Sequence, residues 1–353
     1  MNFSIFKSDT TRFLGVLDCF KSLRFRRKYH EPGEFEIHLP DRLENIKFLS
    51  VDNLIHRDDI KETGIIEKVS IKNRNLVVAG RLLSCCLDNC YIDAIYNIFN
   101  LTYGEVMQKL VENHGKDSYL NPLLNIDNIY KGTQTFNAQI SYKNLLSVLV
   151  TLSKTSNIGF KVYLDPIKQF WQFKSYIGAN RSVLQTMSSP IIFSDEYGNL
   201  SGESYIFDKT NYKNHALVLG EGEGESRTKC YIDMRKCDSE PKRYMIVDAK
   251  DIKREDGMSD SDYQGLLYNR GLDKLAENAI VENFDADAVT GLQWEYLKNW
   301  NLGDMVTIES KAWGISIDKR ITEVEEIYEN GAVKIIPTFG TQAPETLNLD
   351  SLH

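Results

Sequence analysis

The stretch 299–340 has the clearest alternation of apolar and polar positions, and it predicts three strands of one sheet. Residues 305–309 alternate in character, so that Met305, Thr307 and Glu309 would share one face of a strand. Leu302-Gly303-Asp304 before them is typical of a turn. Apolar residues at 321, 324 and 327 mark a second strand, and Asn330-Gly331 is a hairpin signal before a third strand that ends near Gly340. We expect a closed or nearly closed small β-domain here.

The alternation in residues 1–88 predicts an all-β meander or barrel. A short first strand is expected, followed by strands over 14–28, 34–39, 54–57, 63–71 and 75–83. Phe35, Ile37 and Leu39 alternate with charged or polar neighbours, which is the pattern of a half-buried strand. Pro32-Gly33 predicts the turn before that strand, with proline presetting φ and glycine supplying a positive φ.

Residues 89–235 predict a mixed α/β region. We expect helices over 91–99 and 103–113, the second capped by Thr102, and a third helix capped by Ser141 with an apolar stripe between 145 and 152. A polar loop is expected over 117–137. A hairpin over 160–176 and short strands at 190–194, 199–200, 204–208 and 215–219 follow.

Residues 236–345 predict a C-terminal β-domain with one helix. A strand is expected over 244–250, followed by a helix that Ser259 caps. The buried face of this helix is expected to carry Tyr263, Leu266, Leu267, Leu275, Ala276 and Ala279. A strand near 284–288 and a group of aromatic residues at 294–300 lead into the first-described stretch, and 346–353 is expected to be a tail.

Composition and charge narrow the function classes. The 353 residues are 42% hydrophobic and 26% charged, as in globular proteins, and the net charge of −8 gives no electrostatic support for stable nucleic-acid binding. The basic cluster of Arg24, Arg26 and Arg27 therefore predicts a charged interface or a solvated strand edge paired to an acidic strand. The sequence has no apolar run of the ~20 residues that a spanning helix needs, so we expect no membrane insertion. The N-terminus lacks a secretory signal, which predicts a cytosolic chain.

Motifs for chemistry are absent from the sequence. The six cysteines have spacings that favour free thiols over a disulfide framework or a zinc site, and the six histidines form no metal-ligand pattern. Gly220–Glu225 resembles a phosphate loop only in its glycines, because its three glutamates would repel phosphate; an acidic hairpin tip is favoured. The aromatic strand at 170–176 favours core packing over ligand stacking. We therefore expect no catalytic, cofactor-binding or metal-binding residues, although a pair of carboxylates suited to glycoside hydrolysis remains open.

A series of short motifs resembles the siphovirus ReqiPepy-type tail protein family and, more distantly in fold, the baseplate hubs of phage tails and tail-like bacteriocins. The likeness covers most of the chain. It rests on the order and spacing of these segments: 24–40, 64–69, 78–83, 158–160, 176–181, 193–200, 220–227, 247–251, 302–306 and 337–340.

The resemblance implies a β-rich α+β fold in which two β-barrel domains similar to tail-tube subunits flank a mixed middle region. The implied domains are 1–88, 89–235 and 236–345. The implied function is a non-enzymatic hub that joins the tail tube to the tip or spike as a homotrimer, within a virion or tail-like particle assembled in the host cytoplasm. Its implied partners are a tail tube or distal tail protein, a tip or spike protein, and a tape-measure protein.

The family implies no catalytic residues to carry over, so the motif residues are expected to serve turns, packing or interfaces. These residues are Arg24, Arg26, Arg27, Pro32, Gly33, Gly303, Asp304, Phe339 and Gly340. Two alternatives stay open at this point: a tail-associated peptidoglycan hydrolase, and a carbohydrate-binding tip module that uses the aromatic residues at 170–176.

Overall fold

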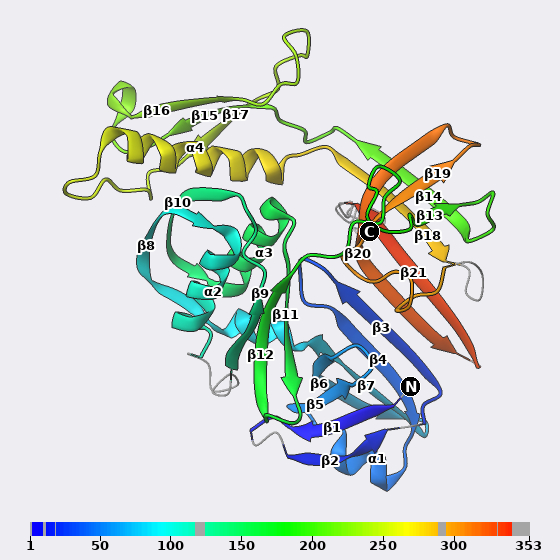
Figure 1. The fold of residues 1–353 in the computed structure, drawn as a ribbon. Helices are drawn as coiled ribbons and strands as arrows, with labels where there is room; N and C mark the ends of the chain where they lie inside the picture. Colours follow the sequence, from blue (N-terminus) through cyan, green and yellow to red (C-terminus); the bar gives the residue numbers. More distant parts are fainter. Residues whose placement is uncertain are drawn as a thin grey trace, which may run out of the picture.

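The computed structural model describes residues 2–9, 12–17, 19–116, 124–288, 294–329 and 331–340. The fold is β-rich α+β, as the sequence predicts. A long twisted sheet runs through the molecule from its N-terminal strands to its C-terminal strands, and the helices gather beside it (Figure 1). The predicted tail at 346–353 lies outside the described residues.

The N-terminal strands form antiparallel pairs of consecutive strands. Their bounds are β1 (Phe3–Lys7), β2 (Phe13–Leu17), β3 (Ser22–Lys28), β4 (Glu34–Pro40), β5 (Asn53–Arg57), β6 (Glu62–Lys72) and β7 (Asn75–Leu82). The pairs are β1 with β2, β3 with β4, β5 with β6 and β6 with β7. The prediction of one strand over 14–28 is wrong, because β2 pairs with β1 whereas β3 pairs with β4 and β20. The all-β prediction is also incomplete, since α1 (Leu43–Phe48) lies between β4 and β5, and a 3-10 helix, η1 (Leu83–Asn89), follows β7.

The C-terminal strands confirm the predicted three-stranded pattern. They are β19 (Met305–Ser310), β20 (Ile315–Glu329) and β21 (Ala332–Gly340), preceded by β18 (Val281–Ala288). Glu329 faces Ala332, so the hairpin between β20 and β21 has a two-residue loop, and its Gly331 has a φ of 79°. Asn330 lies outside the described residues.

One 13-stranded sheet unites the two ends of the chain. Its order is β14-β18-β21-β20-β3-β4-β7-β6-β5-β1-β2, with β19 beside β20 and β13 beside β19. The joint is the antiparallel pair of β3 with β20, which brings residues 22–28 against residues 323–329. The strand order begins at β14 and ends at β2. Among the described strands, these two do not pair with each other, so the sheet does not close into a barrel.

The middle region differs most from its prediction. Residues 91–99 were expected to be helical but belong to a strand, β8 (Tyr91–Thr102), that pairs with β10 (Thr135–Asn144). The isoleucines at 92, 95 and 98 have helical spacing, but β-branched and aromatic side chains favour a strand once a partner strand is present. The expected loop 117–137 contains β9 (Leu124–Ile129) and the start of β10, and residues 117–123 lie outside the described residues.

The helices of the middle region begin at caps. Thr102 caps α2 (Tyr103–His114), as predicted, and it forms a capping box with Glu105. In α3 (Leu145–Ser156) the cap is Asn144, not the predicted Ser141, because Ser141 is still in β10. Asn157 ends α3 in the left-handed conformation, and the predicted hairpin follows as β11 (Gly159–Asp165) and β12 (Phe170–Tyr176).

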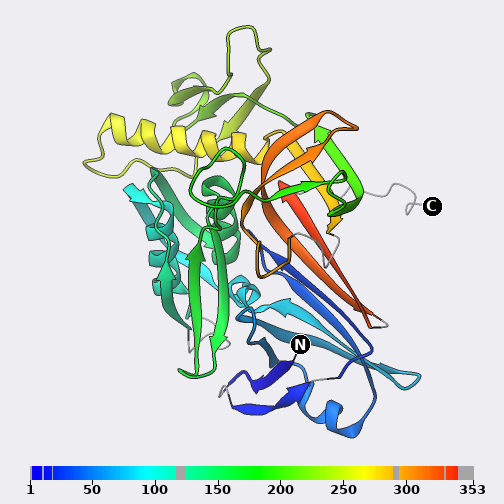
Figure 2. The ribbon, with the colours of Figure 1, turned by 45° about the vertical axis from the view of Figure 1, so that its right-hand side comes forward.

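A separate three-stranded sheet lies beside the longest helix. It consists of β15 (His215–Leu219), β16 (Lys229–Asp233) and β17 (Tyr244–Asp248), and α4 (Asp260–Glu277) covers one of its faces. Figure 2 shows α4 lying between this sheet and the middle region. Ser259 caps α4 as predicted, but Ala276 and Ala279 are exposed rather than buried. The short strands β13 (Ile192–Ser194) and β14 (Leu200–Asp208) join the C-terminal strands.

Among the residues that the structure describes, four apolar clusters make up the core, one for each group of elements just described. Leu149, Trp171 and Phe173 are buried in the cluster of the middle region, and Phe25 and Ile37 in that of the N-terminal strands. In the part of the chain that the structure describes, no helix combines the length and apolarity required to cross a membrane.

Candidate functional site

Strand β3 carries the basic cluster and lies where the two ends of the chain meet. Because side chains alternate along a strand, Arg24 and Arg26 share one face of the sheet, and Arg27 shares the other face with Leu23 and Phe25. β3 therefore presents Arg24 and Arg26 on its outer face and places Arg27 in the core.

The outward arginines are neutralised by acidic residues on both neighbouring strands. Arg26 lies 2.9 Å from Glu34 on β4, 3.0 Å from Glu325 and 3.1 Å from Glu323 on β20. Burial would lower the pKa of Arg26, but the three carboxylates raise it above its ordinary value. Arg24 also pairs with Glu325. The predicted pairing with an acidic strand is confirmed for these two arginines.

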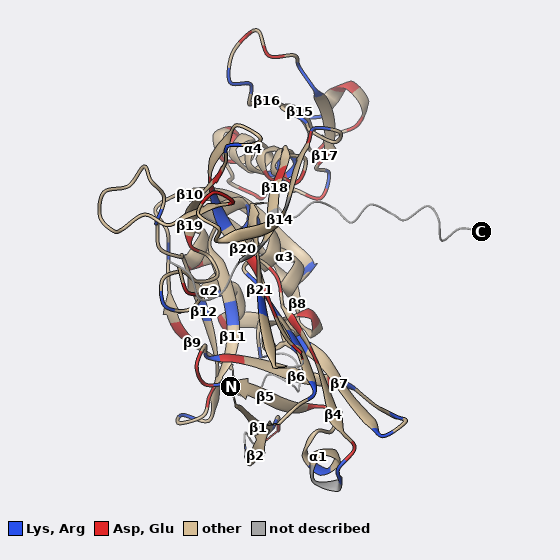
Figure 3. Cartoon of the chain, turned by 90° about the vertical axis from the view of Figure 1, so that its right-hand side faces the viewer, with Lys and Arg blue, Asp and Glu red and all other residues tan. Residues whose placement is uncertain are grey.

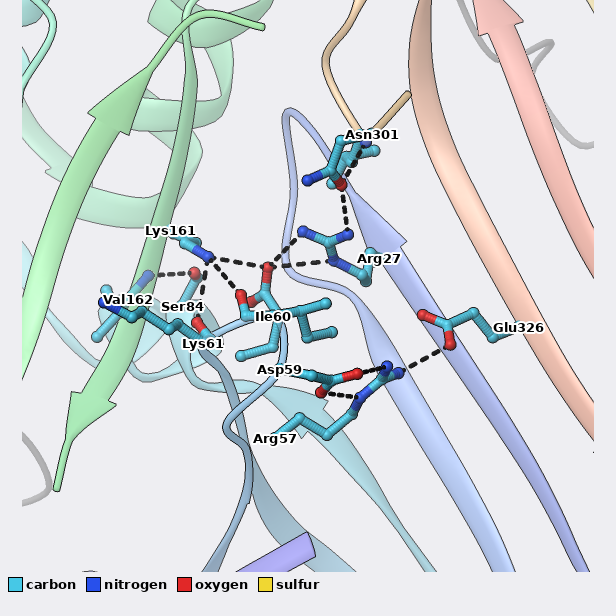
Figure 4. A network of polar contacts seen from close by, with 12 residues as sticks. Arg27, Arg57, Asp59, Ile60, Lys61, Ser84, Lys161, Val162, Asn301 and Glu326 are labelled. Carbon is cyan, nitrogen blue, oxygen red and sulfur yellow. Dashed lines mark hydrogen bonds and ion pairs between the residues drawn. The ribbon is translucent and has the colours of Figure 1, made fainter. Parts of the chain in front are cut away.

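Arg27 does not fit the prediction of a solvated edge, because only 4% of it is exposed. Its guanidinium donates to Glu62 at 3.1 and 3.2 Å and to Asn301 Oδ1 at 2.9 Å (Figure 4). It also donates to the Tyr296 hydroxyl at 2.8 Å. Burial works against the charge, but Tyr296 and Glu62 raise the pKa of Arg27 above its ordinary value. Arg27 thus connects β3 with β6 and with the segment that precedes β19.

Glu62, at the start of β6, links Arg27 to the middle region. Its Oε1 also accepts from Lys161 Nζ on β11 at 3.3 Å, and Lys161 donates to the carbonyls of Ile60 and Lys61 (Figure 4). Burial by itself would raise the pKa of Glu62, but Lys161 and Arg27 hold it below its ordinary value. One carboxylate therefore receives two cations from two different parts of the chain.

A second buried ion pair lies beside the first and ties β5 to β20. Arg57, which is 1% exposed, donates to Glu326 Oε2 at 2.9 Å and to Asp59 Oδ2 at 2.7 Å (Figure 4). Tyr296 donates to Glu326 Oε1 at 3.2 Å and accepts from Arg27. Tyr296 thus joins the two ion pairs into one network. We call Arg27, Arg57, Glu62, Lys161, Tyr296 and Glu326 the buried network.

The predicted Gly303-Asp304 turn lies next to the buried network. Gly303 has a φ of 91°, and a Cβ there would lie 2.5 Å from the ring of Tyr29, which is fully buried. Asp304 accepts from the backbone N–H of Ala179 at 2.8 Å and of Asn301 at 3.0 Å. Burial raises the pKa of Asp304 despite these donors. The turn thus holds the segment after β12 against the start of β19.

The other predicted motif residues lie in packing positions. Gly33 does not have the predicted positive φ; instead a Cβ there would lie 2.1 Å from the Arg26 carbonyl oxygen, so glycine is needed for close approach. Pro32 precedes it in the β3–β4 connection. Phe339 is fully buried, with its ring centroid 5.2 Å from that of Phe193, and Gly340 has a φ of 94° at the end of β21.

Sequence reasoning missed most of the buried network. It named Arg27 but not Arg57, Glu62, Lys161, Tyr296 or Glu326 as site residues. One signal was present: Glu326 lies two positions from Val324 on the same face of a strand, so a charge interrupts an apolar face. The partner of such a charge is distant in sequence, and no local pattern identifies it.

The arrangement suits a rigid joint rather than a reactive centre. Glu62 and Glu326 are buried, and each is hydrogen-bonded to an arginine, with a further bond to Glu326 from Tyr328. Among the residues that the structure describes, no group of His, Cys, Asp and Glu is arranged to hold a metal ion. Trp171 is 1% exposed and Phe173 fully buried, so the predicted core role is confirmed for these two aromatics, whereas Phe170 is 41% exposed.

Comparisons with known proteins support a relationship to phage tails. Residues 2–341 match the family described as Siphovirus ReqiPepy6 Gp37-like protein. The fold is similar to that of prophage tail protein gp18 from Listeria monocytogenes EGD-e, with a TM-score of 0.60, 11% identity, and coverage of 97% of this chain and 96% of that chain. Proteins with curated descriptions give no match to this sequence.

Two further solved structures have the same fold. The 43 kDa tail protein of prophage MuSo2 from Shewanella oneidensis has a TM-score of 0.59 and 10% identity, covering 96% of this chain and 98% of that chain. The tail protein from Neisseria meningitidis MC58 has a TM-score of 0.55 and 13% identity, covering 96% of this chain and 97% of that chain. At such identities the likeness is one of fold.

Proposed function

The chain belongs to the Siphovirus ReqiPepy6 Gp37-like family of phage tail proteins, and we propose that it is a structural hub of the tail tip or baseplate. In this role it joins the tail tube to the tip or spike. Its partners are a tail tube or distal tail protein, a tip or spike protein and a tape-measure protein. It resides in a virion or a tail-like particle that is assembled in the host cytoplasm.

The observation that carries this proposal is the single sheet that joins both ends of the chain. The N-terminal strands and the C-terminal strands each contribute a β-rich module, and β3 and β20 pair directly between them. We propose that each module folds into a barrel-like unit similar to a tube subunit. Three copies of the chain then supply six such units in a ring, which matches a six-fold tube. A ring with closed symmetry is a common form of homo-oligomer.

The buried network supports a load-transmitting role. It links β3, β5, β6, β11 and β20 through paired and hydrogen-bonded charges, so the modules hold a fixed relative orientation. A hub needs such rigidity because its two modules must lie in register with neighbouring copies. In this proposal the N-terminal module is residues 1–88, the mixed middle region is 89–235 and the C-terminal module is 236–345.

Mass measurement and electron microscopy of the purified chain test the proposal. We expect particles with three-fold symmetry. Light scattering of the chain by itself should give three times the chain mass of 40.5 kDa, and a mixture with the tail tube protein should give a larger mass that still contains three copies of this chain. A monomer under both conditions would contradict the ring. Zymography on purified cell wall tests the hydrolase alternative, for which we expect no clearing.

A further inference from the structure

The part of the β12–β13 connection that follows Arg181 carries no charge and presents apolar side chains to solvent. No Asp, Glu, Lys or Arg occurs between Arg181 and Asp195. Leu184 is 85% exposed and Met187 is 97% exposed. Figure 3 shows an uncharged loop standing out from the molecule beside β19. We call residues 182–190 the apolar loop.

Hydrogen bonds hold the apolar loop in one shape. Gln185 Oε1 accepts from the backbone N–H of Met187 at 2.8 Å and of Ser188 at 2.9 Å, and Gln185 Nε2 donates to the Ser188 carbonyl at 2.6 Å. Ser188 Oγ donates to the Asn180 carbonyl at 3.1 Å. The loop therefore forms a tight turn around the Gln185 side chain, with Leu184 and Met187 on its outside.

The base of the apolar loop is fixed to β19. The backbone N–H of Val183 donates to Thr307 Oγ1 at 2.9 Å, and that of Arg181 donates to the Met305 carbonyl at 2.8 Å. Exposed apolar side chains on a backbone that is ordered in this way lose little conformational freedom on binding, which favours their use as contact residues. Exposed apolar surface of this kind marks interaction sites in soluble proteins.

A recess of matching chemistry lies elsewhere on the same C-terminal strands. It has a volume of about 510 Å³ and is lined by Ser204 and Tyr205 of β14, Trp313 of the β19–β20 turn, and Ile315 of β20. Trp313 is 48% exposed and its ring centroid lies 6.0 Å from that of Phe284. The lining carries no formal charge, and methionine sulfur makes favourable contacts with aromatic rings.

We propose that Leu184 and Met187 of one copy insert into the Trp313 recess of the next copy, and that this contact closes the ring. The inference rests on the proposed ring of identical chains. Projection and recess are different surfaces of one chain, so their contact is head-to-tail, which is the kind of interface that generates rings. Both surfaces are uncharged and apolar, so their contact removes apolar area from water without burying an unpaired charge.

Complementation between two variants tests the proposal. Leu184→Asp with Met187→Asp disables the projection and leaves the recess intact, and Trp313→Asp does the reverse. We expect each variant alone to lose the trimer, with self-association weakened at least about tenfold, as measured by analytical ultracentrifugation. We expect an equimolar mixture of the two to form dimers that contain one copy of each, because one intact projection meets one intact recess.

The matched control is Ile167→Asp in the β11–β12 turn. Ile167 is 94% exposed, which is similar to Leu184 and Met187, and it lies outside both proposed contact surfaces. The Ile167→Asp variant should therefore remain a trimer. Unchanged circular dichroism and melting temperature verify that each variant folds. If the Leu184→Asp, Met187→Asp variant still forms a trimer, or if its mixture with Trp313→Asp stays monomeric, the proposed contact of the apolar loop is wrong. Neither result contradicts the proposed ring of three chains. A wild-type chain that is monomeric overturns the ring.

Discussion

At the scale of single residues, buried charges decide the stability of the joint between the two ends of the chain. Glu62 receives both Arg27 and Lys161, and no water-exposed side of its carboxylate remains, since it is 4% exposed. Removing one partner from a buried group of charges is far more damaging than removing a partner at the surface, because the remaining charges are left without compensation.

Glu62→Gln should therefore destabilise the chain strongly. We expect the free energy of unfolding to fall by about 3–5 kcal/mol, because Arg27 and Lys161 lose their counter-charge in the interior. Urea unfolding followed by circular dichroism measures this loss. The control is Glu67→Gln on the same strand, where a 37% exposed carboxylate pairs with exposed Arg81 at 2.7 Å and about 1 kcal/mol or less is expected. Equal losses in both variants would contradict the role of the buried network.

His30 should make stability depend on pH. Burial, together with Lys154 and Arg320, lowers the pKa of His30 from 6.5 to about 4. The unfolded chain then binds a proton between pH 6.5 and 4 while the folded chain does not, so stability falls as the pH is lowered through this range, by about 3 kcal/mol at most. His30→Asn should flatten the decline in melting temperature relative to wild type.

The control for this experiment is His38→Asn, which replaces a histidine at the surface of β4 and should follow the wild-type curve. In the structure His30 Nδ1 lies 2.7 Å from Ser153 Oγ of α3, so the histidine lies where the β3–β4 connection docks on the middle region. If the melting temperature of His30→Asn fell with pH as steeply as that of the wild type, other groups would be responsible for the pH dependence.

At the scale of elements, turns fix how strands approach one another. The Gly303-Asp304 turn lies against the ring of Tyr29, which follows β3. Gly159, the first residue of β11, also lies against this ring, because a Cβ on Gly159 would be 2.3 Å from it. Tyr29 thus fills a space that two glycines leave open, and its hydroxyl lies 3.1 Å from the carbonyl oxygens of Asn157 and Tyr176.

Gly303→Ala should destabilise the chain by about 2–5 kcal/mol. A positive φ costs an alanine about 1–2 kcal/mol, and overpacking against the Tyr29 ring adds about 1–3 kcal/mol. Gly314→Ala is the matched control, because Gly314 has a φ of 64° but no atom within 4 Å of the added Cβ. It should show only the cost of the positive φ. If thermal unfolding gave the same shift for both, the close approach of Tyr29 would not matter.

At the scale of the whole molecule, the pairing of β3 with β20 makes the N-terminal module depend on the C-terminal strands. Without residues 294–329 the edge of β3 is unpaired, Arg57 loses Glu326 of β20, and Arg27 loses Tyr296 and Asn301 of the segment before β19. An unpaired edge strand and two buried, partly unpaired arginines are both unfavourable for an isolated fragment.

A fragment of residues 1–88 should therefore fail to fold cooperatively. We expect a broad, low-temperature transition in circular dichroism and rapid proteolysis, whereas the full chain melts cooperatively. Adding a fragment of residues 294–340 should restore protection if the β3–β20 joint forms between separate chains. Cooperative unfolding of residues 1–88 alone, at the melting temperature of the full chain, would show that the joint contributes little.

Several elements could be predicted from the sequence because their signals are local. The apolar residues at 321, 324 and 327 and the glycine at 331 specify the hairpin of β20 with β21. Thr102 and Ser259 specify the starts of their helices through bonds within one turn. The predictions failed where a distant partner decided. Residues 91–99 have helical spacing, yet they form a strand because β10 is available beside them.

The sequence by itself determined the β-rich class, the family, the hairpins and the helix caps, because these depend on residues that are neighbours along the chain. Only the tertiary structure decided that β20 lies against β3, that Arg27 points into the core, and that Glu62 receives cations from two regions. The physical reason is that a strand offers the same backbone groups to any partner. Its neighbour is chosen by side chains on strands far away in sequence, and the burial of a charge follows from that choice.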